Sequence, residues 1–162
     1  MKQVLILILS LVFLLNAYTA QAQSNYAAFS LGYSPVFGST HVSAYMGNSS
    51  FFDQSVNLRG QLDMNLFIPG ISLSVGADAL YQFPIEELTL YIGAGPDLMF
   101  IPGAEDIIFS YGVHLTAGAE LALENVYLFA ELQPGFFVIP NETASPSAGV
   151  RSSFKLGLGF PF

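Results

Sequence analysis

The sequence predicts an all-β protein, an eight-stranded antiparallel up-and-down transmembrane β-barrel. After residue 23, apolar and polar side chains alternate with a period of two along almost the whole chain, which is the period of a β-strand. Charged residues make up only 10% of the 162 residues, against 52% for apolar ones, whereas about a quarter of a typical soluble domain is charged. So few charges cannot cover a water-facing surface of this size.

The alternation divides the chain into eight expected strands. By residue range these are 26–34, 40–47, 56–66, 71–81, 88–99, 109–121, 126–137 and 150–162. If 140 residues are shared among eight strands, each strand with its connection takes 140/8 = 17.5 residues, and a transmembrane strand needs about 9–11. The connections carry turn-forming residues, namely Ser34-Pro35, Asn48-Ser49-Ser50, Pro69-Gly70, Pro84, Pro102-Gly103, Glu124-Asn125 and 141–149.

One face of each of the first four strands is apolar. In chain order, the residues expected on that face are Ala27, Phe29, Leu31, Tyr33, Val42, Ala44, Met46, Val56, Leu58, Leu62, Met64, Leu66, Ile71, Leu73, Val75, Ala77, Ala79 and Tyr81. The residues between them are small or polar, which is most regular in the range 56–66. Each segment therefore has the pattern of a strand between two different environments.

The last four strands repeat this pattern. Their expected apolar faces carry Leu88, Leu90, Ile92, Ala94, Phe109, Tyr111, Val113, Leu115, Ala117, Leu121, Val126, Leu128, Ala130, Leu132, Val150, Phe154, Leu156, Leu158, Phe160 and Phe162. In the final strand the opposite face carries Arg151, Ser153, Lys155, Gly157, Gly159 and Pro161. No segment after residue 23 predicts a helix of useful length, and no linker divides the chain.

The polar face predicts which side of the sheet faces inward. A soluble, lipocalin-like barrel would have an apolar lumen and a charged exterior, and a membrane barrel reverses this arrangement. Here the polar face is mostly Gly, Ser, Thr and Asn, which suits a narrow lumen better than a surface in water. The glycines with the parity of the polar face are Gly32, Gly47, Gly76, Gly93, Gly95, Gly112, Gly118, Gly135, Gly157 and Gly159, and Gly60 is the exception. We therefore expect the apolar face to contact lipid, with the soluble barrel as the alternative.

The N-terminus has the pattern of an export signal. Lys2 precedes an apolar run from Val4 to Leu15, which is too short to span a bilayer as a helix. Ala20-Gln21-Ala22 then matches the small-x-small cleavage pattern. We expect a signal peptide at 1–22, cleaved after Ala22, and a barrel domain at 23–162.

The end of the chain resembles a known family. Phe154, Leu156, Leu158, Phe160 and the terminal Phe162 alternate along the last strand. Tyr91-Ile92-Gly93-Ala94-Gly95-Pro96 and Lys155-Leu156-Gly157-Leu158-Gly159 also look like strands of this family. With these segments the chain resembles the small eight-stranded outer-membrane barrels, such as the transmembrane domain of outer membrane protein A or outer membrane protein X.

The resemblance implies a place and partners. It implies a Gram-negative outer membrane, outer-membrane lipid around the barrel, and a barrel assembly machinery that recognises Phe160 and Phe162. It also implies periplasmic termini, external loops near 34–40, 67–70, 100–107 and 137–149, and periplasmic turns near 48–55, 82–87 and 122–125. Three features depart from the family: Trp is absent, the loop 67–70 is very short, and no peptidoglycan-binding domain is present, so we expect no anchoring to the cell wall.

Composition excludes several kinds of site. The chain has no cysteine, which excludes thiolate nucleophiles and zinc–thiolate centres. After residue 22 three cations face twelve acids, so the net charge is 3 − 12 = −9. We therefore expect no nucleic-acid partner, because phosphate binding needs basic patches. We also expect no cofactor.

Three polar groups are weighed as catalytic or metal sites. His41 and Ser43 share a strand face and resemble the pair of outer-membrane lipid A deacylases, but their parity is that of the lumen. His114 with Glu120 and Glu131 could ligate a metal, although a hydrogen-bonded lumen network is the better interpretation. Glu105-Asp106 is expected to be a solvated pair of loop charges. We predict no catalytic residue and no metal ligand.

Turn geometry predicts ion pairs in the lumen. If the strands around Pro69-Gly70 join through a turn centred near 68–69, residues whose numbers sum to about 137 face each other. Arg59 then lies opposite Asp78. The same reasoning across 137–149 places Glu131 opposite Lys155. These four residues are the expected ion-pair candidates, because charges in a lumen short of water need partners.

These observations favour a non-enzymatic integral outer-membrane barrel with a structural or surface-interaction role. A small pore or a carrier of small or apolar solutes is the first alternative, although Leu80, Tyr127 and Phe129 have inward parity and would fill a lumen of eight strands. A lipid-modifying enzyme and a soluble periplasmic barrel are further alternatives. The ligand, the protein partners and the oligomeric state do not follow from the sequence.

Overall fold

The computed structural model describes residues 25–51, 55–67, 70–103, 106–140 and 145–162. Eight strands occupy most of these ranges: β1 (Asn25–Ser34), β2 (Ser39–Phe51), β3 (Val56–Phe67), β4 (Gly70–Ile85), β5 (Leu88–Pro102), β6 (Ile107–Leu123), β7 (Val126–Ile139) and β8 (Ser147–Pro161). Within the described ranges no helix is long and apolar enough to cross a membrane. The expected signal peptide, residues 1–22, lies outside the described residues and remains a prediction.

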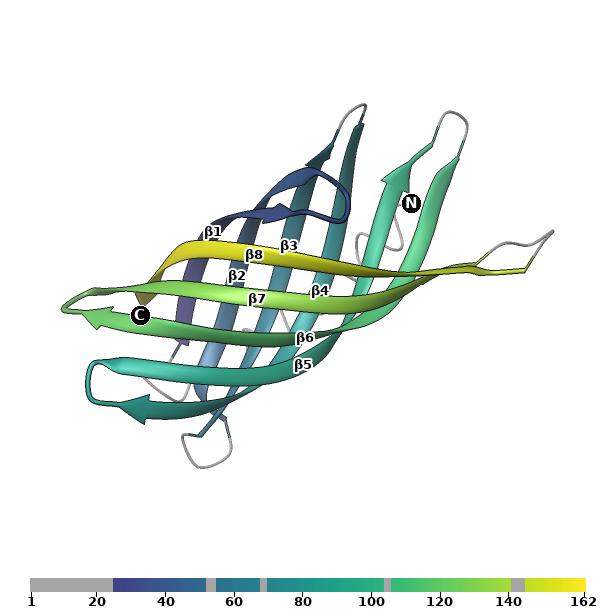
Figure 1. Cartoon of the computed structure of the whole chain (residues 1–162). Coiled ribbons are helices and arrows are strands. Elements are labelled where there is room, and N and C mark those ends of the chain that lie inside the picture. Colours follow the sequence, from purple (N-terminus) through teal and green to yellow (C-terminus); the bar gives the residue numbers. More distant parts are fainter. Residues whose placement is uncertain (1–24, 52–54, 68–69, 104–105, 141–144) are drawn as a thin grey trace.

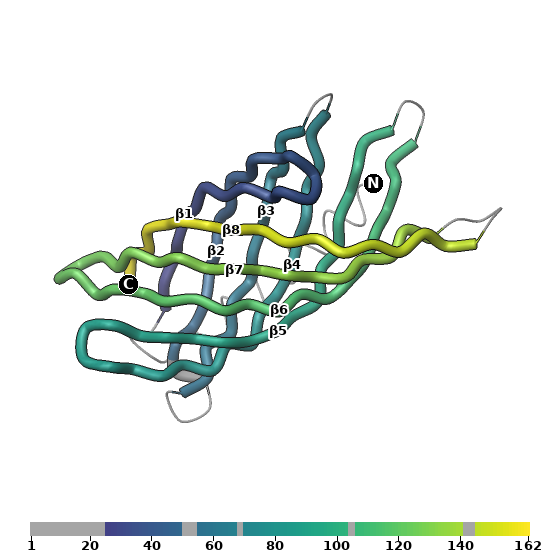
Figure 2. Tube along the Cα trace, in the orientation of Figure 1, coloured from purple at the N-terminus to yellow at the C-terminus, as the bar shows by residue number. Residues whose placement is uncertain are grey.

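The strands form a closed antiparallel barrel in chain order, which confirms the predicted fold. Each strand pairs with the next, and β1 closes the sheet on β8 from Tyr26 opposite Pro161 to Tyr33 opposite Phe154. Figure 1 and Figure 2 show β5 to β8 crossing in front of β1 to β4 at a large angle, as strand tilt in a barrel requires. Closure removes both sheet edges, so the backbone groups of each strand can pair on both sides.

The connections define two ends of the barrel. We call the end with both described termini and the connections β2–β3, β4–β5 and β6–β7 the proximal end, and the opposite end the distal end. The proximal turns at Glu86-Glu87 and Glu124-Asn125 have two residues each, and Glu86 and Glu124 adopt positive φ angles of 55° and 27°. Tight two-residue hairpins of this kind need such backbone angles.

Several strands are longer than the sequence predicts. The connection expected at Pro84 is wrong, because β4 continues to Ile85 and Pro84 pairs with Thr89 of β5. β3 begins at Val56, opposite Tyr81, so Pro84 lies past the described ladder with β3 and its missing N–H breaks no bond there. β2 likewise extends to Phe51 instead of ending near residue 47, with an irregular register between Asn48 and Phe51.

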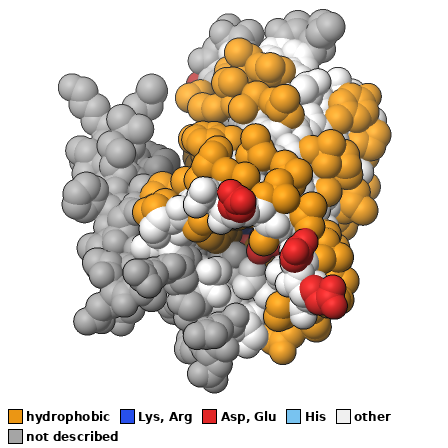
Figure 3. All heavy atoms as spheres, turned by 90° about the vertical axis from the view of Figure 1, so that its left-hand side faces the viewer, with side chains coloured by type: hydrophobic (Ala, Val, Ile, Leu, Met, Phe, Trp, Pro, Cys, Tyr) orange, Lys and Arg blue, Asp and Glu red, His pale blue; other side chains and the backbone are white. Residues whose placement is uncertain are grey.

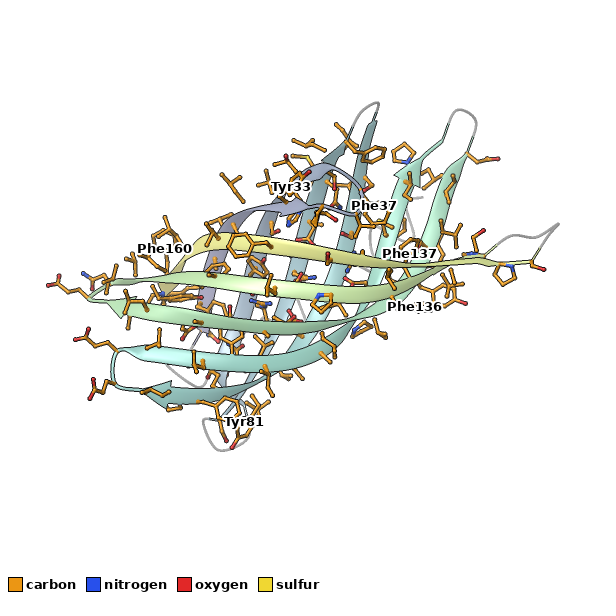
Figure 4. All side chains as sticks on the ribbon, viewed as in Figure 1. Tyr33, Phe37, Tyr81, Phe136, Phe137 and Phe160 are labelled. Atoms are coloured by element: carbon orange, nitrogen blue, oxygen red, sulfur yellow. The ribbon has the colours of Figure 1, made fainter. Side chains whose placement is uncertain are left out.

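The barrel has the inverted polarity that the sequence predicts. Among the described residues, twenty buried side chains are polar or charged and six are apolar. Large apolar residues of all eight strands are exposed on the outside, and Figure 3 shows them covering most of one view of the surface. In Figure 4, the labelled Tyr81 projects away from the ribbon, and Phe160 lies near the C-terminus. Both expected assembly residues, Phe160 and Phe162, are exposed on the outside.

Glycines on the inner face make room for aromatic rings from the neighbouring strand. Tyr26 lies over Gly47, Tyr91 over Gly118, Tyr127 over Gly159, and Phe129 over Gly157, and a Cβ at any of these glycines would overlap the ring. Each ring and its glycine are register partners, as in Phe129 opposite Gly157. The inner glycines are therefore sites where a lumen too narrow for two side chains holds one large ring.

This packing predicts that Gly157→Ala destabilises the barrel, by about 1–3 kcal/mol as is usual for overpacking. The added Cβ would overlap both the Phe129 ring and the carbonyl oxygen of Phe29, and the backbone carbonyl cannot move freely. The measurement is the free energy of unfolding by urea in lipid vesicles. Gly60→Ala is the matched control, because the nearest atom to its Cβ would be the Met46 oxygen at 3.9 Å. Equal effects of the two substitutions would contradict the ring-over-glycine explanation.

Candidate functional site in the barrel lumen

A network of charged side chains crosses the middle of the lumen. Its central members are Arg59 of β3, Asp78 of β4, His114 of β6 and Glu131 of β7, each at most 5% exposed. They come together because each occupies an inward position of its strand. Arg59 is the register partner of Asp78, the residue that turn geometry places opposite it.

Arg59 joins two carboxylates. Its Nε and Nη2 donate to Oδ2 of Asp78 at 2.9 and 2.7 Å, and its Nη1 donates to Oε2 of Glu131 at 2.8 Å. The guanidinium carbon also lies 4.5 Å from the centre of the Tyr45 ring. The planar fork of an arginine suits such a double contact, and the ring face adds a cation–π interaction. Arg59 therefore ties β3 to both β4 and β7.

His114 bridges two further carboxylates. Its Nδ1 lies 2.6 Å from Oδ2 of Asp97, and its Nε2 lies 2.5 Å from Oδ1 of Asp78. A neutral imidazole carries one N–H and cannot donate to both, so the arrangement needs one additional proton shared among these three groups. The same proton balances the charge of the network. Without it, Arg59, Arg151 and Lys155 face four bonded carboxylates, those of Asp63, Asp78, Asp97 and Glu131.

Lys155 pairs across the lumen rather than along the sheet. It is the register partner of Glu131, as turn geometry predicts, but its Nζ lies 3.1 and 3.2 Å from the two carboxylate oxygens of Asp63. Glu131 instead accepts from Arg59, Tyr45 and Tyr91. The expected Glu131–Lys155 ion pair is therefore replaced by a cross-barrel pair, because side chains that point into a narrow lumen meet residues of non-adjacent strands.

Aromatic residues fill the proximal half of the lumen. Tyr45 packs edge-on against Phe129, with ring centres 5.6 Å apart, and Tyr26 packs edge-on against Tyr127 at 5.7 Å. Leu80 is buried beside them. A hollow of about 260 Å³ remains at this end, bounded in part by Arg59 and Glu120. The inward residues that the sequence identifies as lumen-filling, Leu80, Tyr127 and Phe129, thus occupy the lumen.

The other weighed residues do not assemble into a reactive site. His41 and Ser43 are 2% and 0% exposed inside the barrel, with the His41 ring over Gly32, so the lipid outside cannot reach them. His114 contacts Asp78 and Asp97 rather than Glu120 or Glu131. Within the described part of the chain, no cluster of three or more His, Asp or Glu side chains could hold a metal ion. Glu105 lies outside the described residues.

Sequence reasoning missed three members of the network. Asp63, Asp97 and Arg151 all bond to charged partners, and the Arg151 guanidinium contacts Oδ2 of Asp97. Their inward parity was visible in the sequence, but their partners belong to strands that are not neighbours, as in Arg151 of β8 and Asp97 of β5. Only the diameter and shear of the closed barrel decide such contacts.

The central ion pair predicts strong energetic coupling between Arg59 and Asp78. Removing one partner of a desolvated pair costs about 3–5 kcal/mol, so Arg59→Gln and Asp78→Asn should each destabilise the barrel. In a double-mutant cycle by urea unfolding in lipid vesicles, their interaction energy should lie within the range of about 0.5–3 kcal/mol that is usual for contacting residues. A charge swap is a poor choice here, because an aspartate at position 59 would face Glu131.

The matched control for this cycle pairs Arg59→Gln with Asp63→Asn, because Asp63 bonds to Lys155 and lies in another part of the network. The interaction energy of this second pair should be clearly smaller. Coupling indistinguishable from zero for Arg59 and Asp78, or equal coupling in the two cycles, would show that the ion pair does not stabilise the barrel.

Comparison with known proteins identifies the fold. No protein-family profile matches the chain, and no curated protein matches its sequence. Two solved structures are similar. The N-terminal β-barrel domain of OprF from Pseudomonas aeruginosa has a TM-score of 0.64 and 18% identity, covering 86% of this chain and 98% of that one. Neisserial surface protein A has a TM-score of 0.57 and 18% identity, covering 86% and 95%. The chain therefore shares the fold of small eight-stranded outer-membrane barrels.

Proposed function

We propose that this protein is an integral outer-membrane β-barrel with a non-enzymatic structural or surface-interaction role. The observation that carries the proposal is the polarity of the barrel, whose outside is apolar on every strand while the charges are paired inside. Soluble proteins rarely expose contiguous apolar surfaces of such extent. A closed barrel is one of the two structures that can cross a bilayer with its backbone groups satisfied.

The remaining signals agree with the outer membrane as the location. The N-terminal pattern predicts export with cleavage after Ala22. The two similar solved structures include a surface protein of Neisseria and a barrel domain of P. aeruginosa OprF. In this proposal the partners are outer-membrane lipid and the barrel assembly machinery, which would recognise the outward Phe160 and Phe162.

Packing of the lumen supports a role other than catalysis or free diffusion. The charged side chains of the network bond to one another, so they are engaged in holding the barrel closed. The His41 and Ser43 side chains are enclosed by the barrel wall. The aromatic residues of the proximal half narrow the path that a solute would take, which disfavours the alternative of a pore. A pore would reveal itself by discrete conductance steps in a planar bilayer.

The proposal predicts that the expressed protein is recovered in the outer-membrane fraction and migrates differently on a detergent gel before and after boiling. A closed barrel resists unfolding by detergent until it is heated, so the unboiled sample should run as a separate folded band. Fractionation and gel mobility are the two measurements. Recovery in the soluble periplasmic fraction, with one mobility under both conditions, would favour a soluble barrel instead.

Deletion of Phe162 should lower the amount of folded protein in the outer membrane more than it lowers synthesis. The side chain is exposed on the outside of the final strand, at the position that the family resemblance assigns to assembly. Val150→Ala, which truncates an exposed apolar residue near the other end of β8, is the control and should assemble normally. Normal outer-membrane levels of the deletion variant would refute the assembly role.

A further inference from the structure

The distal mouth of the barrel is polar on one side and apolar on the other. Inward positions of β1 to β4 near this end carry Ser34, Ser39, His41, Asn65, Ser72 and Ser74. Inward positions of β5 to β8 near the same end carry Met99, Ile101, Ile108, Phe137 and Ile139, which we call the apolar lip. The lip is unexpected, because inward positions elsewhere along these strands are mainly glycine, polar or aromatic.

The lip departs from the alternation that defines the rest of the barrel. At the β5–β6 hairpin the outward neighbours Phe100 and Phe109 are also apolar and in ring contact, so both faces of the hairpin are apolar. Ile108 is 44% exposed. Contact with lipid accounts for the outward face of this hairpin, but not for the inward one.

A side chain from the β1–β2 turn borders the lip. The Phe37 and Phe137 rings have centres 5.7 Å apart, although Phe37 itself remains 47% exposed. Figure 4 shows these two residues at the end of the barrel opposite Phe160. Phe137 in turn lies over Gly149 of β8. The mouth therefore has an apolar wall that is partly covered and still open to the outside.

A hollow of about 180 Å³ lies between the apolar lip and the charged network. Asp97, Met99, Phe137 and Arg151 line it, together with Gly112, which has no side chain to fill it. The side chain of Arg151 is 16% exposed, compared with 4% for Arg59 and 1% for Lys155. Among the described cations, Arg151 is thus the one that a molecule entering from the distal mouth meets.

Arg151 retains capacity to bind an anion. Its Nη2 contacts Asp97, but Asp97 also holds His114, so this carboxylate is shared between two cationic partners. A guanidinium carries five N–H donors in a planar fork and can accept a second carboxylate beside the first. The hollow therefore has an anion-binding group at its inner end and an apolar wall toward the outside.

We propose that the distal mouth binds an anionic amphiphile with a single alkyl chain, its carboxylate at Arg151 and its chain along the apolar lip. The order of the groups, with the cation inside and the apolar residues outside, fits a molecule that has one charged end and one apolar end. The inference goes beyond the proposed function and depends on the barrel fold alone, so it can fail while the outer-membrane assignment holds.

The three methionines of the barrel provide a direct test. Met99 belongs to the lip, whereas Met46 and Met64 lie on the outer surface, 45% and 39% exposed. In protein labelled with ¹³C at the methionine methyl groups and held in lipid nanodiscs, titration with octanoate should shift the Met99 resonance with saturation. Met46 and Met64 should show only the gradual shift caused by octanoate in the lipid. Octylamine, with the opposite charge, should cause no saturable shift of Met99.

Two substitutions separate the contributions of the head group and the chain. Arg151→Gln should weaken octanoate binding at least tenfold, and Arg151→Lys should preserve part of it because the charge remains. Ile108→Ser, on an exposed part of the lip, should weaken binding without disturbing the ion network. The separate mobility of the unboiled band on a detergent gel verifies that each variant folds.

Three results would overturn the proposal. The first is the absence of a saturable Met99 shift in the folded wild-type protein. The second is saturation with octylamine at the same affinity as octanoate, which would mean that Arg151 does not select the charge. The third is parallel shifts of all three methionines, which would mean that octanoate only enters the lipid.

Discussion

The structure depends on one constraint, which is that a sheet surrounded by lipid must satisfy all its polar groups within itself. Pairing of β1 with β8 meets this constraint for the backbone by removing the sheet edges. The side chains then follow from it: those that face lipid are apolar, and those with charges point inward and need partners. The low charge content of the chain is a direct consequence, because the only enclosed space available for charges is a lumen of eight strands.

The narrow lumen also explains how the interior is packed. Where a large ring points inward, the neighbouring strand supplies glycine, as in Phe129 over Gly157 and Tyr127 over Gly159. Where a charge points inward, its partner comes from across the barrel, as in Lys155 with Asp63. Both solutions follow from the same geometry, since side chains of opposite walls are close enough to meet and adjacent positions are too close to hold two large groups.

The two ends of the lumen differ in a way that bears on function. The proximal half is filled by aromatic rings that pack on one another, and the middle by ion pairs. The distal mouth alone combines an accessible cation with apolar inward residues and an open hollow. An interaction site is therefore most plausible physically at the distal mouth, where the packing that closes the lumen stops and binding would not require breaking the ion network.

The sequence by itself determined the strand count, the antiparallel order and the inward or outward position of nearly every residue, because these depend on a period of two and on local turns. It also placed Arg59 opposite Asp78 and Glu131 opposite Lys155, since hairpin register is a local property. Only the tertiary structure decided that Lys155 bonds to Asp63, that His114 joins Asp78 to Asp97, and that Arg151 lies beneath the apolar lip. These contacts link strands distant in the chain, and they depend on barrel diameter and strand tilt, which no local pattern records.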